Sequence, residues 1–259
     1  MKKKNILCFI AALISCTAIF CSCGASDENV PDVSEMTASA EADSISDVDL
    51  TKGASSLFEC ADGWCNGSMF NVTWRKENCT FENGRMQLII DKDKKDGSVP
   101  YSGAEYRSKD FYGSGRYEVR MKAIKNDGVV SSFFTYTGPS DSNPWDEIDI
   151  EILGKDTTKV QFNYFTDSKG NHEYLYDLGF DASEDFHDYA FEWHKDKIVW
   201  FVDGKEAYTA SENIPVTPGK IMMNAWCGTG VDSWLNAFND SHMPLTAEYE
   251  SISFVPFDE

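Results

Sequence analysis

One short segment, Trp145–Leu153, carries a strict alternation of acidic and apolar side chains. Successive side chains of a β-strand point to opposite faces, so this pattern predicts a strand with two chemically different faces. Glu147, Asp149 and Glu151 share one face, and isoleucines occupy the other. Neighbouring carboxylates repel one another and push at least one pKa upward. The pattern is typical of a catalytic site in which one acid is protonated and another ionised. The alternative is the solvated face of an edge strand, where acidic side chains prevent aggregation.

Runs of alternating, β-branched or aromatic residues recur through the C-terminal part of the chain. Such runs are typical of strands when Gly, Pro, Asn or Asp residues separate them. Asp203-Gly204 stands between two of them and is a strong signal for a hairpin turn. Because no segment has a long helical period, we expect an all-β domain built as an antiparallel two-sheet sandwich. The expected strands include residues 116–123, 128–138, 159–166, 189–193, 198–202, 221–226 and 247–255.

Residues 1–23 have the features of a secretory signal, because lysines are followed by an apolar run that is short for a membrane span. Cys23 ends this run in a context similar to a bacterial lipobox, in which the cysteine is lipidated after cleavage. Cys16 also fits a lipobox, and a secreted protein without a lipid is the remaining alternative. Each interpretation places the domain outside the cytoplasm, with a lipid anchor as its only link to a membrane.

The composition changes in residues 24–56. Between residues 24 and 50 there are eight acidic residues, no Lys or Arg and no aromatic residue. Such a segment cannot bury enough apolar surface to offset its conformational entropy. We therefore expect an acidic disordered tether, followed by one domain over residues 57–259.

The charge balance excludes some classes of partner. The chain has a formal net charge of −20, whereas nucleic-acid binding needs a basic surface. A neutral polysaccharide is compatible with this charge, and we expect a monomer. The histidines are scattered and no CxxC pair is present, so neither a zinc site nor a cysteine nucleophile is expected. Four cysteines of the domain leave three possible disulfide pairings: Cys60, Cys65, Cys79 and Cys227.

The acidic strand has the groups that cleavage of a glycosidic bond requires. A retaining glycosidase uses two carboxyl groups about 5–5.5 Å apart, one as nucleophile and one as proton donor. Glu147 and Glu151 are the natural pair, but four residues of flat strand span about 13 Å. We therefore expect a curved strand in which Asp149 controls the orientation and charge of Glu147. Sugar sites also need aromatic surfaces and polar donors, and alternation places Glu105 with Arg107, and Asn224 with Trp226, on shared faces.

Several blocks of sequence resemble the bacterial lichenases, which are the endo-β-1,3-1,4-glucanases of glycoside hydrolase family 16. The similarity extends from about residue 58 to 254, and the uninterrupted Glu-x-Asp-x-Glu spacing is also the lichenase form. The related laminarinases commonly carry one more residue before the last Glu. The blocks that carry the resemblance are residues 130–139, 144–151, 153–163, 178–182, 218–224 and 228–232.

The resemblance implies a concanavalin A-like jelly-roll sandwich with a concave substrate cleft and a retaining mechanism. It implies that Glu147 is the nucleophile, Glu151 the acid/base and Asp149 the assisting carboxylate. An endo-β-1,3-glucanase and a non-catalytic glycan-binding lipoprotein are the alternatives, and the complete acidic set counts against the second. The positions that match the cleft are Asn66, Glu105, Arg107, Ser132, Phe134, Tyr136, Trp145, Asn163, Asn224, Trp226 and Trp234.

The chain also departs from the family pattern. The usual disulfide joins positions that are Val72 and Gly103 here, so that bridge is absent. Cys65 and Cys227 lie beside cleft positions, and we hypothesise that they pair instead. A cleft tyrosine is replaced by Phe165, which removes a hydroxyl. No cofactor is required by the mechanism, and a structural calcium would lie in the neighbourhood of Gly84 and Glu250, where the family has an aspartate in place of the Glu.

Overall fold

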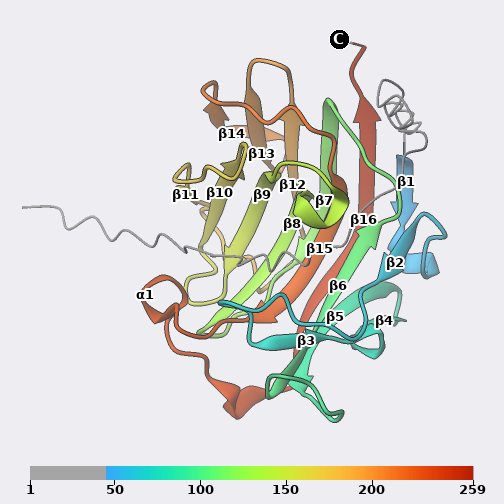
Figure 1. The fold of residues 1–259 in the computed structure, drawn as a ribbon, viewed down its shortest axis with the longest axis vertical. Helices are drawn as coiled ribbons and strands as arrows, with labels where there is room; N and C mark the ends of the chain where they lie inside the picture. The colour runs from blue at the N-terminus through green and yellow to red at the C-terminus, as the bar shows by residue number, and fades with distance from the viewer. Residues whose placement is uncertain (1–44, 259) are drawn as a thin grey trace, which may run out of the picture. The chain divides into compact units, whose positions relative to one another are not determined.

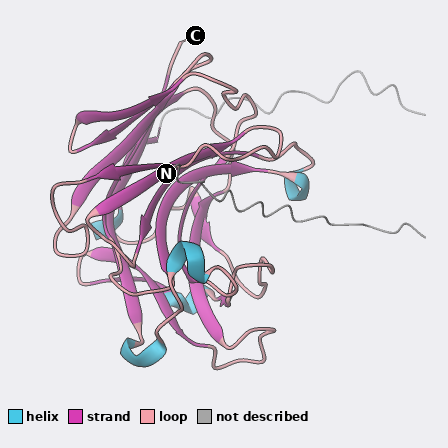
Figure 2. Ribbon diagram, turned by 90° about the vertical axis from the view of Figure 1, so that its left-hand side faces the viewer, coloured by secondary structure: helices cyan, strands magenta, loops and turns pink. Residues whose placement is uncertain are grey.

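The computed structural model describes residues 45–258, and the predicted signal with its cysteines lies outside them. Strands dominate these residues, and the helices are single turns (Figure 2). None of the described helices is long and apolar enough to cross a membrane. The helical turns are η1 (Leu50–Lys52), η2 (Lys76–Asn78), η3 (Pro139–Asp141), α1 (Asp232–Leu235) and η4 (Asp240–His242).

One sheet carries the acidic segment and is called the carboxylate sheet below. Its strands run in the order β11-β10-β9-β8-β15-β6-β2, each antiparallel to its neighbour (Figure 1). Their bounds are β2 (Phe58–Cys60), β6 (Tyr101–Ser108), β8 (Val129–Thr137), β9 (Asp146–Leu153), β10 (Lys159–Phe165), β11 (Tyr174–Asp177) and β15 (Lys220–Cys227).

The second sheet, called the back sheet, has the order β4-β5-β16-β7-β12-β13-β14, and β1 also pairs with β16. A short strand, β3 (Val72–Trp74), runs parallel to β6. The remaining bounds are β1 (Ile45–Asp49), β4 (Cys79–Glu82), β5 (Arg85–Lys92), β7 (Gly115–Lys122), β12 (His187–Trp193), β13 (Ile198–Val202), β14 (Lys205–Ala210) and β16 (Leu245–Pro256). The architecture is the expected jelly-roll sandwich, and each strand expected from the sequence is present within a few residues.

The core lies between the two sheets. Ile148, Ile150 and Ile152 of β9 are completely buried there, and each such side chain contributes about 1.5–3 kcal/mol of transfer free energy. Two hydrogen bonds cross the core, from the Tyr249 hydroxyl to the Ser132 carbonyl (3.0 Å) and from the Trp200 indole to the Asp149 carbonyl (3.1 Å). Since β9 is flanked by β8 and β10, the edge-strand alternative for the acidic segment is wrong.

The hairpin predicted at Asp203-Gly204 joins β13 to β14. Both residues have positive φ angles, 47° and 72°, which is the backbone of the tight turn that suits the twist of paired strands. Glycine adopts this conformation without steric cost, and aspartate is among the few other residues that tolerate it.

The boundary predicted for the tether is wrong at its C-terminal end. Residues 45–49 form β1 and pair with β16, and Ile45 and Leu50 are buried. The composition of the whole segment hid Ile45, Val48 and Leu50, which are buried in the core although acidic residues lie between them. The domain therefore begins at or before residue 45.

The suggested pairing of Cys65 with Cys227 is not formed, and all four cysteines of the described part of the chain are free thiols. The Cys65 thiol contacts the Phe70 carbonyl (3.4 Å), and the Cys227 thiol contacts the Asn71 carbonyl (3.7 Å). Each sulfur is thus bonded to backbone rather than to the other. Val72 and Gly103 do lie together, since a Cβ at position 103 would stand 3.1 Å from that of Val72.

Candidate active site

The carboxylate sheet brings most of the predicted site residues together in three rows that run across the strands. Side chains directly opposite one another on paired strands share a face, so the register alone assembles the rows. The first is Gln161, Glu151, Ser132, Asn224 and Glu105; the second is Asn163, Asp149, Phe134, Met222 and Arg107; the third is Phe165, Glu147, Tyr136 and Lys220.

Glu147 is half-buried and is held by Trp145, just before β9, and by Asp149 on the strand. The Trp145 indole N–H donates to its Oε2 at 2.5 Å, and Asp149 is also hydrogen-bonded to it. Phe165 stacks on Trp145, with ring centroids 4.4 Å apart and planes 15° apart. Burial raises the pKa of Glu147 to about 7, and the two hydrogen bonds oppose that rise. Phe165 therefore packs against the indole that orients Glu147.

Glu151 receives a different partner. The Gln161 amide donates to its Oε2 at 2.6 Å, while the Trp234 indole donates to the amide oxygen of Gln161 at 3.2 Å. These two hydrogen bonds fix which end of the Gln161 amide faces the carboxyl group. Burial raises the pKa of Glu151 to about 8, and the charge of Glu147 adds to the rise. Glu151 thus keeps its proton to a higher pH than Glu147.

Asp149 lies between the two glutamates and is 4% exposed. Burial raises its pKa well above the usual range, and the charges of Glu147 and Glu151 raise it further. The hydrogen bond between them also raises the pKa of Asp149 and lowers that of Glu147, so Asp149 is the donor and Glu147 the acceptor. One carboxylate, one neutral donor and one retained proton are the groups that displacement at a sugar carbon needs.

A buried polar cluster continues the first row away from Glu151. The Ser132 hydroxyl donates to the Asn224 amide oxygen at 2.6 Å, and Asn224 is hydrogen-bonded to Glu105. Burial raises the pKa of Glu105 to about 7, although Arg107 and Asn224 oppose the rise. The amide and hydroxyl have fixed orientations, which suits recognition of sugar hydroxyl groups.

Aromatic side chains border the same face. The Arg107 guanidinium lies 4.9 Å from the ring of Trp64, which is 38% exposed, and it pairs with Glu59 at 3.1 Å. Asn66, in the same loop, accepts from the Trp74 indole at 2.9 Å. Trp226 is only 3% exposed and belongs to the core, so as a platform it has little free surface.

Sequence reasoning did not identify Gln161, Met222 or Trp64. Gln161 alternates with Asn163 on a predicted strand, so the face it shares with that candidate was available as a signal. Met222 stands in the same relation to Asn224. Trp64 lies in a loop without periodicity, and only its neighbour Asn66 pointed to it.

The residues suggested for calcium do not fit a calcium site. Gly84 lies in the turn between β4 and β5, and the Glu250 carboxylate is paired with the Arg120 guanidinium at 2.9 Å. A cation is therefore already bound to the one carboxylate proposed for the metal. Among the described residues no group of three or more His, Cys, Asp or Glu side chains is arranged to hold a metal ion.

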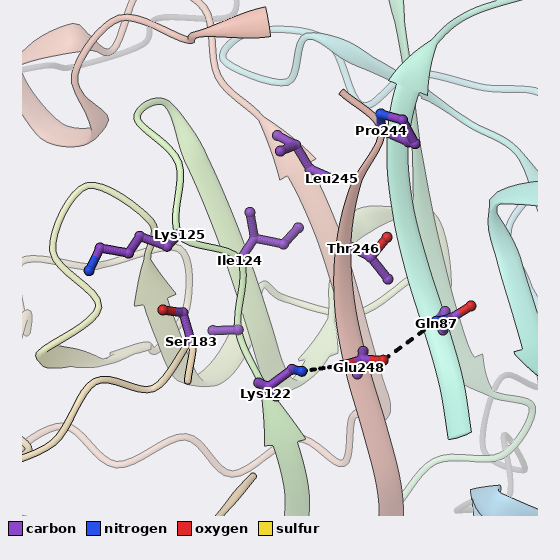
Figure 3. A pocket seen from close by; sticks show the side chains of 10 residues that line it. Gln87, Lys122, Ile124, Lys125, Ser183, Pro244, Leu245, Thr246 and Glu248 are labelled. Atoms are coloured by element: carbon purple, nitrogen blue, oxygen red, sulfur yellow. Dashed lines mark hydrogen bonds and ion pairs between the residues drawn. The ribbon is translucent and has the colours of Figure 1, made fainter. Parts of the chain in front are cut away.

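A separate pocket of about 450 Å³ lies over the back sheet (Figure 3). Lys122 and Glu248 form an ion pair of 2.5 Å on its wall, and Gln87 also contacts Glu248. Lys125, which also lines it, pairs with Asp181 at 2.6 Å. Each charged group of the lining thus has an ionic partner, and no residue of the three rows contributes to the pocket.

Comparison with known proteins gives matches in both sequence and structure. Residues 66–247 match the profile described as "Glycosyl hydrolases family 16". A "Beta-glucanase" of Acetivibrio thermocellus is 61% identical over 202 residues, or 78% of this chain, and the chain spans only 60% of that relative. A "Beta-glucanase" of Paenibacillus polymyxa is 56% identical, covering 77% of this chain and 83% of its own length. The crystal structure of a β-1,3-1,4-glucanase (lichenase) from a mouse hindgut metagenome superposes with a TM-score of 0.79, at 56% identity over 82% of this chain and 98% of that one.

Proposed function

The chain belongs to glycosyl hydrolases family 16, and we propose that it is a retaining endo-hydrolase of mixed-linkage β-1,3-1,4-glucan. The observation that carries the proposal is the different environment of the two glutamates on one face of β9. Glu147 is bonded by an indole and a neutral acid, which favours its ionised form, and Glu151 retains its proton to higher pH. This difference supports Glu147 as the nucleophile and Glu151 as the proton donor.

The proposed reaction has two displacements. The Glu147 carboxylate attacks the anomeric carbon while Glu151 gives its proton to the departing glycosidic oxygen, which leaves a glycosyl ester on Glu147. Glu151, now ionised, takes a proton from water, and that water attacks the anomeric carbon and releases Glu147. The protonated Asp149 supports the first step by donating to the Glu147 oxygen that does not attack.

The substrate's hydroxyl groups have candidate partners on the same face. Asn163 is 5% exposed and its amide oxygen has no hydrogen-bond partner among the described residues. It stands opposite Asp149 in the register of β9 and β10. An unpaired buried acceptor costs free energy, and a sugar hydroxyl placed there would remove that cost.

Barley β-glucan and laminarin distinguish this proposal from the endo-β-1,3-glucanase alternative. We expect rapid release of short oligosaccharides from barley β-glucan, and a rate on laminarin lower by a factor of about 100 or more, because a site that fits one linkage pattern discriminates strongly against another. Chromatography of the products measures both rates. Strong laminarin cleavage with inert barley glucan would overturn the substrate assignment, and inertness toward both would favour the glycan-binding alternative.

We further propose that the protein acts outside the cytoplasm, attached by a lipid on Cys23. The basic start, apolar run and lipobox-like context support this, with Cys16 as the other candidate. The mass of the mature N-terminal peptide tests it: a diacylglycerol-modified cysteine is expected, and an unmodified terminus elsewhere would exclude the anchor.

A further inference from the structure

We propose that Cys60 and Cys79 are a modification site, at which the two thiols oxidise to a disulfide that joins β2 to β4. The bridge would close the segment between them, which carries Trp64 and Asn66 at the border of the active-site face. It adds a covalent constraint to a loop that is otherwise held by packing and hydrogen bonds.

The packing around Tyr106 brings the two strands together. Phe58 stacks on the Tyr106 ring with centroids 5.1 Å apart, and Phe81 meets the same ring edge-on at 5.4 Å. Side chains two residues apart on a strand share a face. Cys60 therefore lies on the same side of β2 as Phe58, and Cys79 on the same side of β4 as Phe81.

The residue between Phe58 and Cys60 has its side chain on the opposite face of β2. Glu59, between Phe58 and Cys60, pairs with Arg107 on the active-site face. Cys60 must then point inward, where it packs against the core cluster that contains Cys79. The two inward thiols are hydrogen-bonded to each other.

The two thiols differ in exposure and in pKa, and this difference predicts which of them reacts first. Cys60 is half-buried and Cys79 is buried. The hydrogen bond from the Cys79 thiol lowers the pKa of Cys60, whereas the same contact and burial raise the pKa of Cys79. Cys60 is therefore the thiol that an external reagent reaches and that forms the thiolate more readily.

The oxidant is a small-molecule disulfide such as oxidised glutathione. The Cys60 thiolate attacks one of its sulfurs, forms a mixed disulfide and releases one glutathione thiol. The Cys79 thiol then loses its proton and attacks the Cys60 sulfur, which releases the second glutathione. Two protein thiols are oxidised and one external disulfide is reduced to two thiols, so atoms and electrons balance.

The other two thiols of the described domain are matched controls. Cys65 and Cys227 contact the backbone carbonyls of Phe70 and Asn71 and not a second sulfur. Cys65 has a similar partial exposure to Cys60, so access alone does not distinguish it. If accessibility decided the chemistry, Cys65 would react as readily as Cys60.

The test incubates the full-length protein with oxidised glutathione, alkylates the remaining thiols and maps the peptides by mass spectrometry. We expect a peptide pair joined through Cys60 and Cys79, with Cys65 alkylated or carrying glutathione. The oxidised protein should melt roughly 6–12 °C higher than the same protein after reduction, because the bridge restricts a loop of this length in the unfolded chain.

Two variants complete the test. Cys60→Ser should abolish both the joined peptides and the reduction-dependent shift in melting temperature, whereas Cys65→Ser should retain both. A stable glutathione adduct on Cys60 with Cys79 still free, or a bridge between Cys60 and Cys65, would overturn the proposal. The peptide map of the unmodified protein decides the question even if a variant folds poorly.

Discussion

Glu147→Gln is expected to lower the turnover of barley β-glucan by a factor on the order of 10⁴ or more, because an amide cannot form the glycosyl ester. The change keeps the size of the side chain and its hydrogen bond with Trp145. Binding of the polysaccharide should therefore remain detectable by calorimetry or by retardation in a gel that contains the glucan. The measured pair of results, lost turnover with retained binding, separates a nucleophile from a residue that merely holds substrate.

The stability of the Glu147→Gln variant can also be predicted. Burial raises the pKa of Glu147 to about 7 in the folded protein, above its usual value of about 4.3 in an unfolded chain. The folded state therefore prefers the protonated form, and this contribution to stability is lost as the pH rises from about 4 through 7. Gln is always neutral, so the variant should melt no lower than the unmodified protein at pH 8. Glu184→Gln, at an exposed position, is the matched control and should keep full activity. Persistent activity in Glu147→Gln would mean that another residue is the nucleophile.

The two faces of β9 could be predicted from the sequence because they depend only on the alternation of side chains along a strand. Alternation alone places three carboxylates opposite Ile148, Ile150 and Ile152, and the structure buries all three isoleucines. The turn at Asp203-Gly204 is equally local, since two positive φ angles restrict which residues can occupy it. In both cases the deciding interactions lie within a few residues in sequence.

The partners of the carboxylates depend on strand register and could not be predicted in this way. Gln161 meets Glu151 because β10 pairs with β9 in one particular register, and Trp234 then reaches Gln161 from a helical turn far along the chain. The same reason explains the wrong cysteine pairing. Cys65 and Cys227 were expected to pair because each lies next to a position that matches the substrate cleft. In the structure, the packing of β2 and β4 on Tyr106 instead brings Cys60 to Cys79. Composition likewise failed for residues 45–49, because the pairing with β16 outweighs their acidic character.

Glu151→Ala is expected to lower the turnover of barley β-glucan by a factor of about 100 to 10,000, the usual range for loss of a general acid. The same variant should keep much of its rate of glycosyl-ester formation on an oligosaccharide that carries an aryl leaving group. The phenolate of an acidic phenol leaves without taking up a proton. Comparing the pre-steady-state burst of phenolate from the aryl substrate with the turnover of the polysaccharide isolates the proton donation, because the burst reports ester formation alone. An equal loss on both would contradict the assignment of Glu151 as the acid.

The pH profile and added azide give the second half of this prediction. In the unmodified protein the rate should rise as Glu147 loses its proton near pH 7 and fall as Glu151 loses its proton near pH 8. Glu151→Ala should lose the falling limb on the aryl substrate while it keeps the rising limb. Azide fits the space left by the carboxyl group and needs no base, so it should restore turnover and give the β-glycosyl azide, since attack on the Glu147 ester inverts the anomeric carbon a second time. An α-azide would show that the ester had never formed and that the roles of the two glutamates are reversed.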